Sequence, residues 1–140
     1  MIKRPKFLEA TMINLLTKNG SKWKSEKILF KTLKSIQKKN SKDAFGILKL
    51  AIINSSPYFQ IKKIRRKKKN PVEFPFLLQN STRVIYGIKS IILKSKYKKF
   101  NTELLESSNQ VGLSFASKKT LHKEAFLKKK LPIIGGFFNF

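Results

Sequence analysis

The residues with the clearest chemical potential lie in one cationic run in the middle of the chain. From Lys62 to Lys69, every residue except Ile64 carries a positive charge. Residues that favour β-strands flank the run, such as Tyr58 before it and Phe74 after it. Strand-forming segments on both sides of a polar tip predict a β-hairpin. A hairpin with this much positive charge is suited to bind a polyanion.

The whole chain shares this charge bias. Its 140 residues include 32 Lys and Arg against 7 Asp and Glu, which gives a net charge of +25. Nucleic acid is the preferred partner, because the neutralisation of phosphates releases condensed counterions. Composition alone does not separate RNA from DNA, so a DNA-binding architectural protein stays open as the alternative. An anionic membrane surface is a third possibility.

Composition and length also limit the fold and the kinds of site. The length suits one domain over residues 1–140, and 41% hydrophobic residues supply a small core. The absence of cysteine excludes disulfides and thiolate metal sites. We expect no metal, no cofactor and no small-molecule substrate. We also expect no membrane insertion, because the apolar clusters are short and interrupted by lysine. The N-terminus lacks the apolar core of a secretory signal.

The sequence offers little support for catalysis. His122 is the single histidine, and the acidic residues are scattered. Glu103 and Glu106 stand one helical turn apart, but we interpret them as part of a solvated helix face. His122 is interpreted as a packing or RNA-facing residue. We therefore expect no catalytic residue and no enzymatic activity.

Apolar periodicity predicts a mainly α chain with one hairpin. The expected helices cover residues 7–18, 21–38, 42–54, 81–99, 101–117 and 118–131, with the hairpin over 58–78 between the third and fourth. The second helix is expected to turn Trp23, Ile28 and Leu33 inward. The fifth is expected to bury Leu104 and Val111.

One compositional bias concerns the source of the chain. It contains 28 Lys but only 4 Arg, although Arg is the better fork for phosphate. We interpret this excess as the codon bias of an AT-rich genome, as organellar genomes often have. An AT-rich bacterium or parasite nucleus is the alternative.

Three segments resemble a known family, protein seven of the small ribosomal subunit. The first runs over 14–33, with an apolar pair, a turn glycine with lysines, and an apolar triplet on the second helix, all at the family's spacing. The second leads through Pro57 into the hairpin, and the third is the Leu121-His122-Lys123 segment. The chain departs from the family at Ser21, usually a lysine, and at the hairpin tip, where the family often has glycines.

The resemblance implies a bundle of six helices with a long basic β-hairpin between helices 3 and 4. It also implies direct binding to the 3′ major domain of small-subunit rRNA and support of head assembly. The hairpin would lie near exit-site tRNA and the mRNA path, with neighbouring head proteins as further partners. Divergence and AT-rich bias favour a mitochondrial ribosome over a plastid or bacterial one.

The candidate rRNA-binding residues are His122 and cations of the hairpin, the N-terminus and the helices. They are Lys3, Arg4, Lys18, Lys22, Lys24, Lys62, Lys63, Arg65, Arg66, Lys67, Lys68, Lys69, Arg83, Lys89, Lys118, Lys119, His122 and Lys123. Tyr58 and Phe59 are interpreted as packing residues of the hairpin, with stacking on a base as the alternative.

Overall fold

The computed structural model describes residues 6–40, 43–96 and 99–128. Within these ranges the chain forms six helices and one two-stranded antiparallel sheet. The elements are α1 (Lys6–Leu16), α2 (Lys22–Asn40), α3 (Ala44–Ser55), β1 (Phe59–Arg66), β2 (Lys69–Leu77), α4 (Asn80–Lys94), α5 (Phe100–Ser108) and α6 (Leu113–Lys128). This confirms the predicted mainly α class, with a hairpin between the third and fourth helices.

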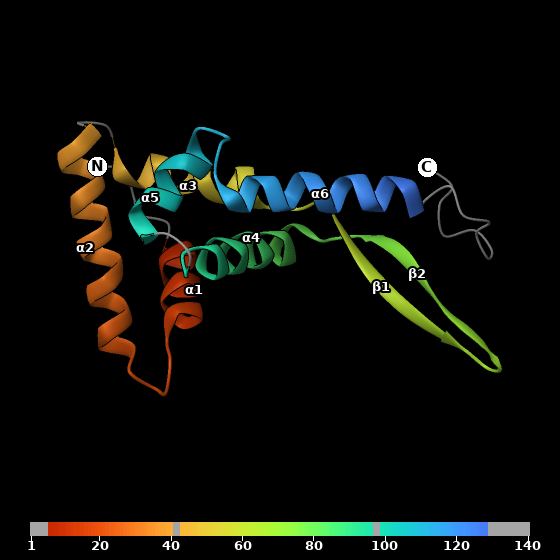
Figure 1. Ribbon diagram of the computed structural model, residues 1–140. Coiled ribbons are helices and arrows are strands. Elements are labelled where there is room, and N and C mark those ends of the chain that lie inside the picture. Colours follow the sequence, from red (N-terminus) through yellow and green to blue (C-terminus); the bar gives the residue numbers. More distant parts are fainter. Residues whose placement is uncertain (1–5, 41–42, 97–98, 129–140) are drawn as a thin grey trace.

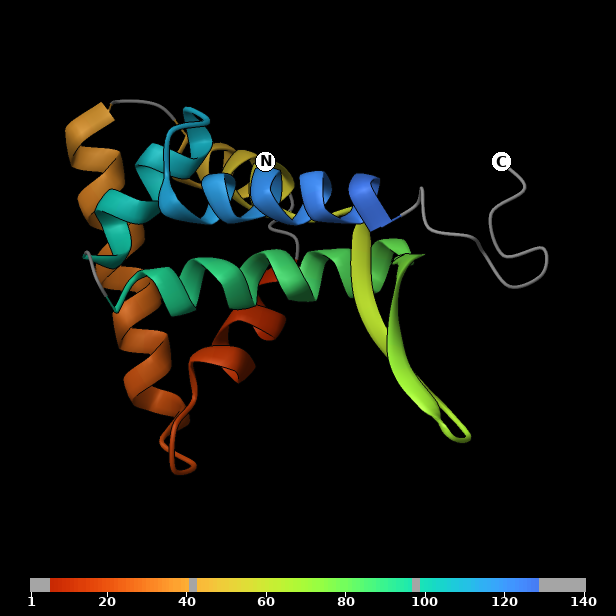
Figure 2. The same ribbon diagram turned by 45° about the vertical axis from the view of Figure 1, so that its right-hand side comes forward.

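The helices form one body from which the hairpin projects. Figure 1 shows α2 across one end of the bundle and the two strands leaving its opposite end. In the turned view of Figure 2 the tip of the hairpin still stands clear of every helix. At their base the strands contact α6. The cationic run is therefore presented away from the core.

The core lies around α3, which packs against α2, α4, α5 and α6. Side chains such as Leu29, Leu48 and Ile88 are fully buried there. The α4 helix approaches α3 closely at Gly87, where an added Cβ would lie 2.6 Å from the Ser56 hydroxyl oxygen. The predicted apolar stripes thus bring the helices together. Gly87, which has no side chain, allows the close distance between α3 and α4.

Two of the predicted inward positions on α2 are wrong. Leu33 is buried as expected, but Trp23 is 59% exposed and Ile28 is 49% exposed. Both lie in the first half of α2, and the helix buries one stripe, with Leu29 and Leu33, against its neighbours. At about 100° per residue, Trp23 and Ile28 lie roughly 100° to either side of that stripe, so their apolar character, and not their spacing, accounts for the wrong prediction.

The predicted boundary between the fifth and sixth helices is also wrong. The ranges 101–117 and 118–131 are replaced by α5 ending at Ser108 and α6 beginning at Leu113. Between them Gln110 takes a left-handed conformation with φ of 62°. The backbone N–H of Ser114 then donates to the Glu103 carboxylate at 2.9 Å. Val111, expected inside, is 74% exposed because it belongs to this turn.

The end of α4 differs from its expected range as well. The sequence predicts a helix over 81–99, but α4 ends at Lys94. The hydroxyl of Ser95 donates to the Ile92 carbonyl, and its N–H donates to the Ile91 carbonyl. These local bonds close the last turn.

The two strands pair from Phe59 opposite Leu77 to Arg66 opposite Lys69, with one irregularity between Ile64 and Arg66. At the tip, Lys68 adopts a φ of 61°, the region that glycine enters without steric cost. The chain therefore makes the turn without a glycine, at a cost of about 1 kcal/mol.

Candidate nucleic-acid interface

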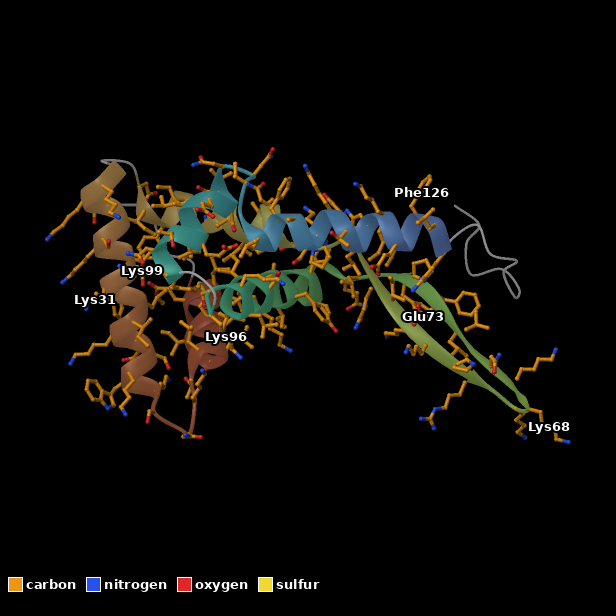
Figure 3. All side chains as sticks on the ribbon, viewed as in Figure 1. Lys31, Lys68, Glu73, Lys96, Lys99 and Phe126 are labelled. Carbon is orange, nitrogen blue, oxygen red and sulfur yellow. The ribbon has the colours of Figure 1, made fainter. Side chains whose placement is uncertain are left out.

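The hairpin carries a dense set of exposed cations. The side chains of Lys62, Lys63, Arg65, Lys67, Lys68 and Lys69 are all exposed. Successive strand residues point to opposite faces, so the charges cover both sides of the ribbon. Figure 3 shows Lys68 at the far tip. The hairpin can thus contact phosphates on either side.

One acidic residue of the hairpin, Glu73, forms ion pairs, one of which connects the hairpin to α6. Its carboxylate lies 3.6 Å from the Lys63 ammonium and forms a second ion pair with Lys128 of α6. Figure 3 shows Glu73 on β2, the strand nearer to the end of α6. The ion pair with Lys128 links the strand to the helix and leaves the tip cations without a carboxylate partner among the described residues.

The base of the hairpin is held by His122. The backbone N–H of Tyr58 donates to Nε2 of His122 at 3.0 Å. The imidazole also packs against the rings of Tyr58 and Phe59, with both centroid distances at 5.7 Å. Nε2 must be unprotonated to accept this bond. His122 therefore packs in the folded protein, in line with the first of its two interpretations, and Phe59 packs against it.

The ring of Tyr58 gathers two cations from different helices. The guanidinium carbon of Arg83, on α4, lies 3.8 Å from the ring centroid. The Lys118 ammonium, on α6, lies 5.3 Å from the same centroid. Nε of Arg83 is buried and has no hydrogen-bond partner in the described part of the chain. Two positive charges from different helices thus lie near one aromatic ring.

The pKa of Lys118 reflects mainly its partial burial. Burial lowers the pKa of Lys118, and the positive charge of Arg83 lowers it further, while Tyr58 raises it. A phosphate placed between Arg83 and Lys118 would stabilise both positive charges. We name Tyr58, Arg83, Lys118 and His122 the hairpin-base cluster.

The other predicted residues lie in separate places. Lys18, Lys22 and Lys24 are exposed around the turn from α1 to α2, far from the hairpin in Figure 1. Lys89 is exposed on α4, and Lys119 and Lys123 are exposed on α6. Lys3 and Arg4 lie outside the described residues, as does the side chain of Arg66. The predicted set is thus divided among the hairpin, its base and the α1–α2 turn.

The sequence gives no signal for the hairpin-base cluster as a unit. Tyr58, Arg83 and Lys118 are far apart in the chain, and the packing of α6 against both the strands and α4 brings them together. The sequence predicts a packing role for Tyr58, yet the residue is 48% exposed and its ring lies near both cations. Proteins that bind single-stranded nucleic acid combine aromatic rings, on which bases stack, with positive charge.

Two other kinds of site are absent from the described part of the chain. No group of three or more metal-ligating side chains occurs within 6–40, 43–96 and 99–128. Among the same residues, no helix is long and apolar enough to cross a bilayer.

The His122 contact predicts a pH-dependent stability. Burial lowers the pKa of His122, and the charges of Lys118 and Arg83 lower it further. The imidazole of His122 therefore binds a proton more tightly in the unfolded chain than in the folded protein. The free energy of unfolding should fall as the pH drops through about 6.5 and level off below the folded pKa. Urea midpoints at about pH 7.5 and 5.5 measure the change.

The matched control is His122→Gln, whose side-chain oxygen can accept the Tyr58 N–H but does not titrate. Its midpoints should differ less between the two pH values than those of the wild type. The chain has one histidine, so an unchanged pH dependence in the variant would contradict the assignment.

Sequence comparisons match the chain to one protein family. The sequence model of this family, described as ribosomal protein S7p/S5e, matches residues 3–129 of this chain. The chain is 30% identical over 129 residues to small ribosomal subunit protein uS7c of Euglena gracilis, which covers 87% of this chain and 82% of that protein. It is 27% identical over 139 residues to uS7m of Schizosaccharomyces pombe, with 92% and 53% covered. For uS7 of Shewanella sediminis the identity is 28% over 135 residues, with 89% and 86% covered.

Proposed function

The chain belongs to the ribosomal protein S7p/S5e family of the small ribosomal subunit, and from this premise we propose that it binds the 3′ major domain of small-subunit rRNA. Its role in the proposal is structural, without enzymatic activity, cofactor or metal. Residues 1–140 act as one rRNA-binding domain. The protein supports assembly of the subunit head and contacts neighbouring head proteins.

The observation that carries the proposal is the projecting hairpin with its exposed cations. Folded RNA offers irregular phosphate surfaces that proteins recognise largely by shape. A narrow ribbon that is charged on both faces can enter such a surface, while the core stays outside. The hairpin-base cluster adds two cations where the ribbon meets the helices. We place the hairpin near exit-site tRNA and the mRNA path, as expected from the resemblance.

The compartment in this proposal is a mitochondrial ribosome. Its support is compositional, since 28 Lys against 4 Arg fits an AT-rich organellar genome. The relatives named above do not favour one compartment. A tagged chain should sediment with the mitochondrial small subunit at moderate salt, and its absence from that fraction would contradict this placement.

Binding to rRNA fragments tests the function directly. At about 200 mM salt, where non-specific binding is weakened, the full chain should bind a fragment of the 3′ major domain more tightly than an equally long fragment of the 5′ domain. Duplex DNA should compete poorly. Equal affinity for the two fragments would overturn the proposal, and efficient competition by DNA would favour a DNA-binding architectural protein.

A further inference from the structure

A surface cavity of about 470 Å³ lies where the turn from α1 to α2 meets the end of α4. This is the end of the bundle opposite the hairpin (Figure 1). Its apolar lining consists of Leu16, Ile28, Ile92 and Phe100, which come from α1, α2, α4 and α5. The cavity is therefore built by the tertiary packing of four helices and is not a groove along one of them.

Three lysines from separate segments also line the cavity. Lys18 belongs to the α1–α2 turn, Lys24 to the first turns of α2, and Lys96 follows α4. Lys96, labelled in Figure 3, lies at the end of α4 nearest to α2. The described lining residues include no Asp or Glu. The cavity thus combines an apolar surface with positive charge that has no acidic counterpart in its lining.

This cavity explains why Ile28 is exposed. The sequence predicts that Ile28 faces the core, yet it is 49% exposed and forms part of the cavity lining. A half-exposed apolar side chain beside unneutralised lysines is suited to a ligand that has a flat apolar face and a negative charge. A nucleotide has both. The volume lies within the usual range of about 300–1,000 Å³ for small-molecule sites.

We propose that this cavity binds one unpaired nucleotide of RNA, with its base against Ile28 and Phe100 and its phosphates at Lys18, Lys24 and Lys96. The inference rests on the proposed rRNA-binding function and specifies the ligand at the α1–α2 turn, where Lys18 and Lys24 are already candidate rRNA-binding residues. A base inside a duplex stays stacked between its neighbours and cannot enter such a cavity. Unpaired bases in loops and bulges can.

The test fills the cavity without a change in charge. Ile28→Trp places a larger side chain in the lining. Leu50→Trp is the matched control, because Leu50 is 52% exposed on α3 and does not line the cavity. Fluorescence anisotropy at about 150 mM salt would measure binding of the full-length proteins to a labelled single-stranded RNA of about 12 nucleotides and to the matching duplex.

The wild type and Leu50→Trp should bind the single strand with equal affinity. Ile28→Trp should lose about tenfold in affinity for the single strand, the usual scale for one base contact, and should bind the duplex as before. Unchanged affinity of Ile28→Trp for the single strand would overturn the inference. An equal loss on both RNAs would also overturn it.

A competition experiment separates base recognition from charge. Millimolar uridine monophosphate should displace the single strand from the wild type more effectively than inorganic phosphate does. Equal displacement by both would overturn the assignment to a nucleotide. The 3′ major domain fragment is bound mainly by the hairpin in the proposed function. Its continued binding to the wild type would keep that function intact even if the cavity test failed.

Discussion

Replacement of five hairpin lysines by glutamine is expected to weaken binding to the 3′ major domain fragment by about a hundredfold or more at about 100 mM salt. The changed residues are Lys62, Lys63, Lys67, Lys68 and Lys69. The slope of log affinity against log salt is negative, and each phosphate that is no longer neutralised reduces its magnitude by about 0.7–0.9. The slope of the variant should therefore be less negative by about 4. Filter binding or anisotropy over a range of salt concentrations measures both quantities.

The control removes the same amount of charge from the opposite end of the molecule. Lys27, Lys31, Lys34, Lys38 and Lys39 are all exposed on α2 and can be changed to glutamine together. Both variants have the same net charge, so any general electrostatic attraction is equally reduced. A larger loss for the hairpin variant supports a specific role of the ribbon. Equal losses would show that the total charge, and not its position, determines affinity.

The helices of this fold are predictable because their apolar residues recur at helical spacing. Leu33 and Leu104 each fall on a predicted apolar face and are buried. The hairpin is predictable because its cations cannot be buried and its flanks favour strands. These features can be predicted from local sequence, because each depends on the residue pattern within a single segment of the chain.

The hairpin-base cluster is not predictable from local pattern. The sequence assigns Arg83 and Lys118 to rRNA binding only as separate charges on separate helices. Their meeting on the Tyr58 ring depends on how α4 and α6 pack at the base of the strands. No spacing in the sequence encodes that distance. The sequence thus identifies which residues are charged, while the fold determines which charges act together.

The turn between α5 and α6 shows a second kind of limit. Asn109 and Gln110 read as part of one long helix, because neither is a strong helix breaker. Gly112 is the one residue in this segment whose type indicates a turn between α5 and α6. An added Cβ there would lie 2.6 Å from the Ser107 hydroxyl oxygen and 2.9 Å from Oε1 of Glu103. This close approach requires glycine, and it exists because of a buried carboxylate that the sequence pattern places in solvent.

Glu103 is fully buried, which corrects its interpretation as part of a solvated helix face. Its Oε1 accepts hydrogen bonds from the Ser114 backbone N–H and hydroxyl, both at 2.9 Å. It also accepts a longer bond of 3.3 Å from the Ser107 hydroxyl. The Ser55 hydroxyl on α3 joins this network through Ser114. One carboxylate oxygen thus connects the start of α6 to α5, and through the serines to α3.

Glu103→Ala is therefore expected to lower the free energy of unfolding by about 3 kcal/mol. The change leaves the buried Ser114 N–H without its acceptor and opens a cavity between α5 and α6. Glu103→Gln should cost less, because its amide oxygen can still accept from Ser114. Urea unfolding followed by circular dichroism measures all three proteins.

Glu124→Ala provides the charge control, since Glu124 is exposed on α6. Removal of any acid increases the net positive charge of the chain, and the resulting repulsion lowers stability without any local contact. A loss in Glu103→Ala that exceeds the loss in Glu124→Ala by about 2 kcal/mol or more identifies the hydrogen-bond network as the cause. If the two variants unfold at the same urea concentration, general repulsion explains the effect and the buried carboxylate does not hold α5 and α6 together.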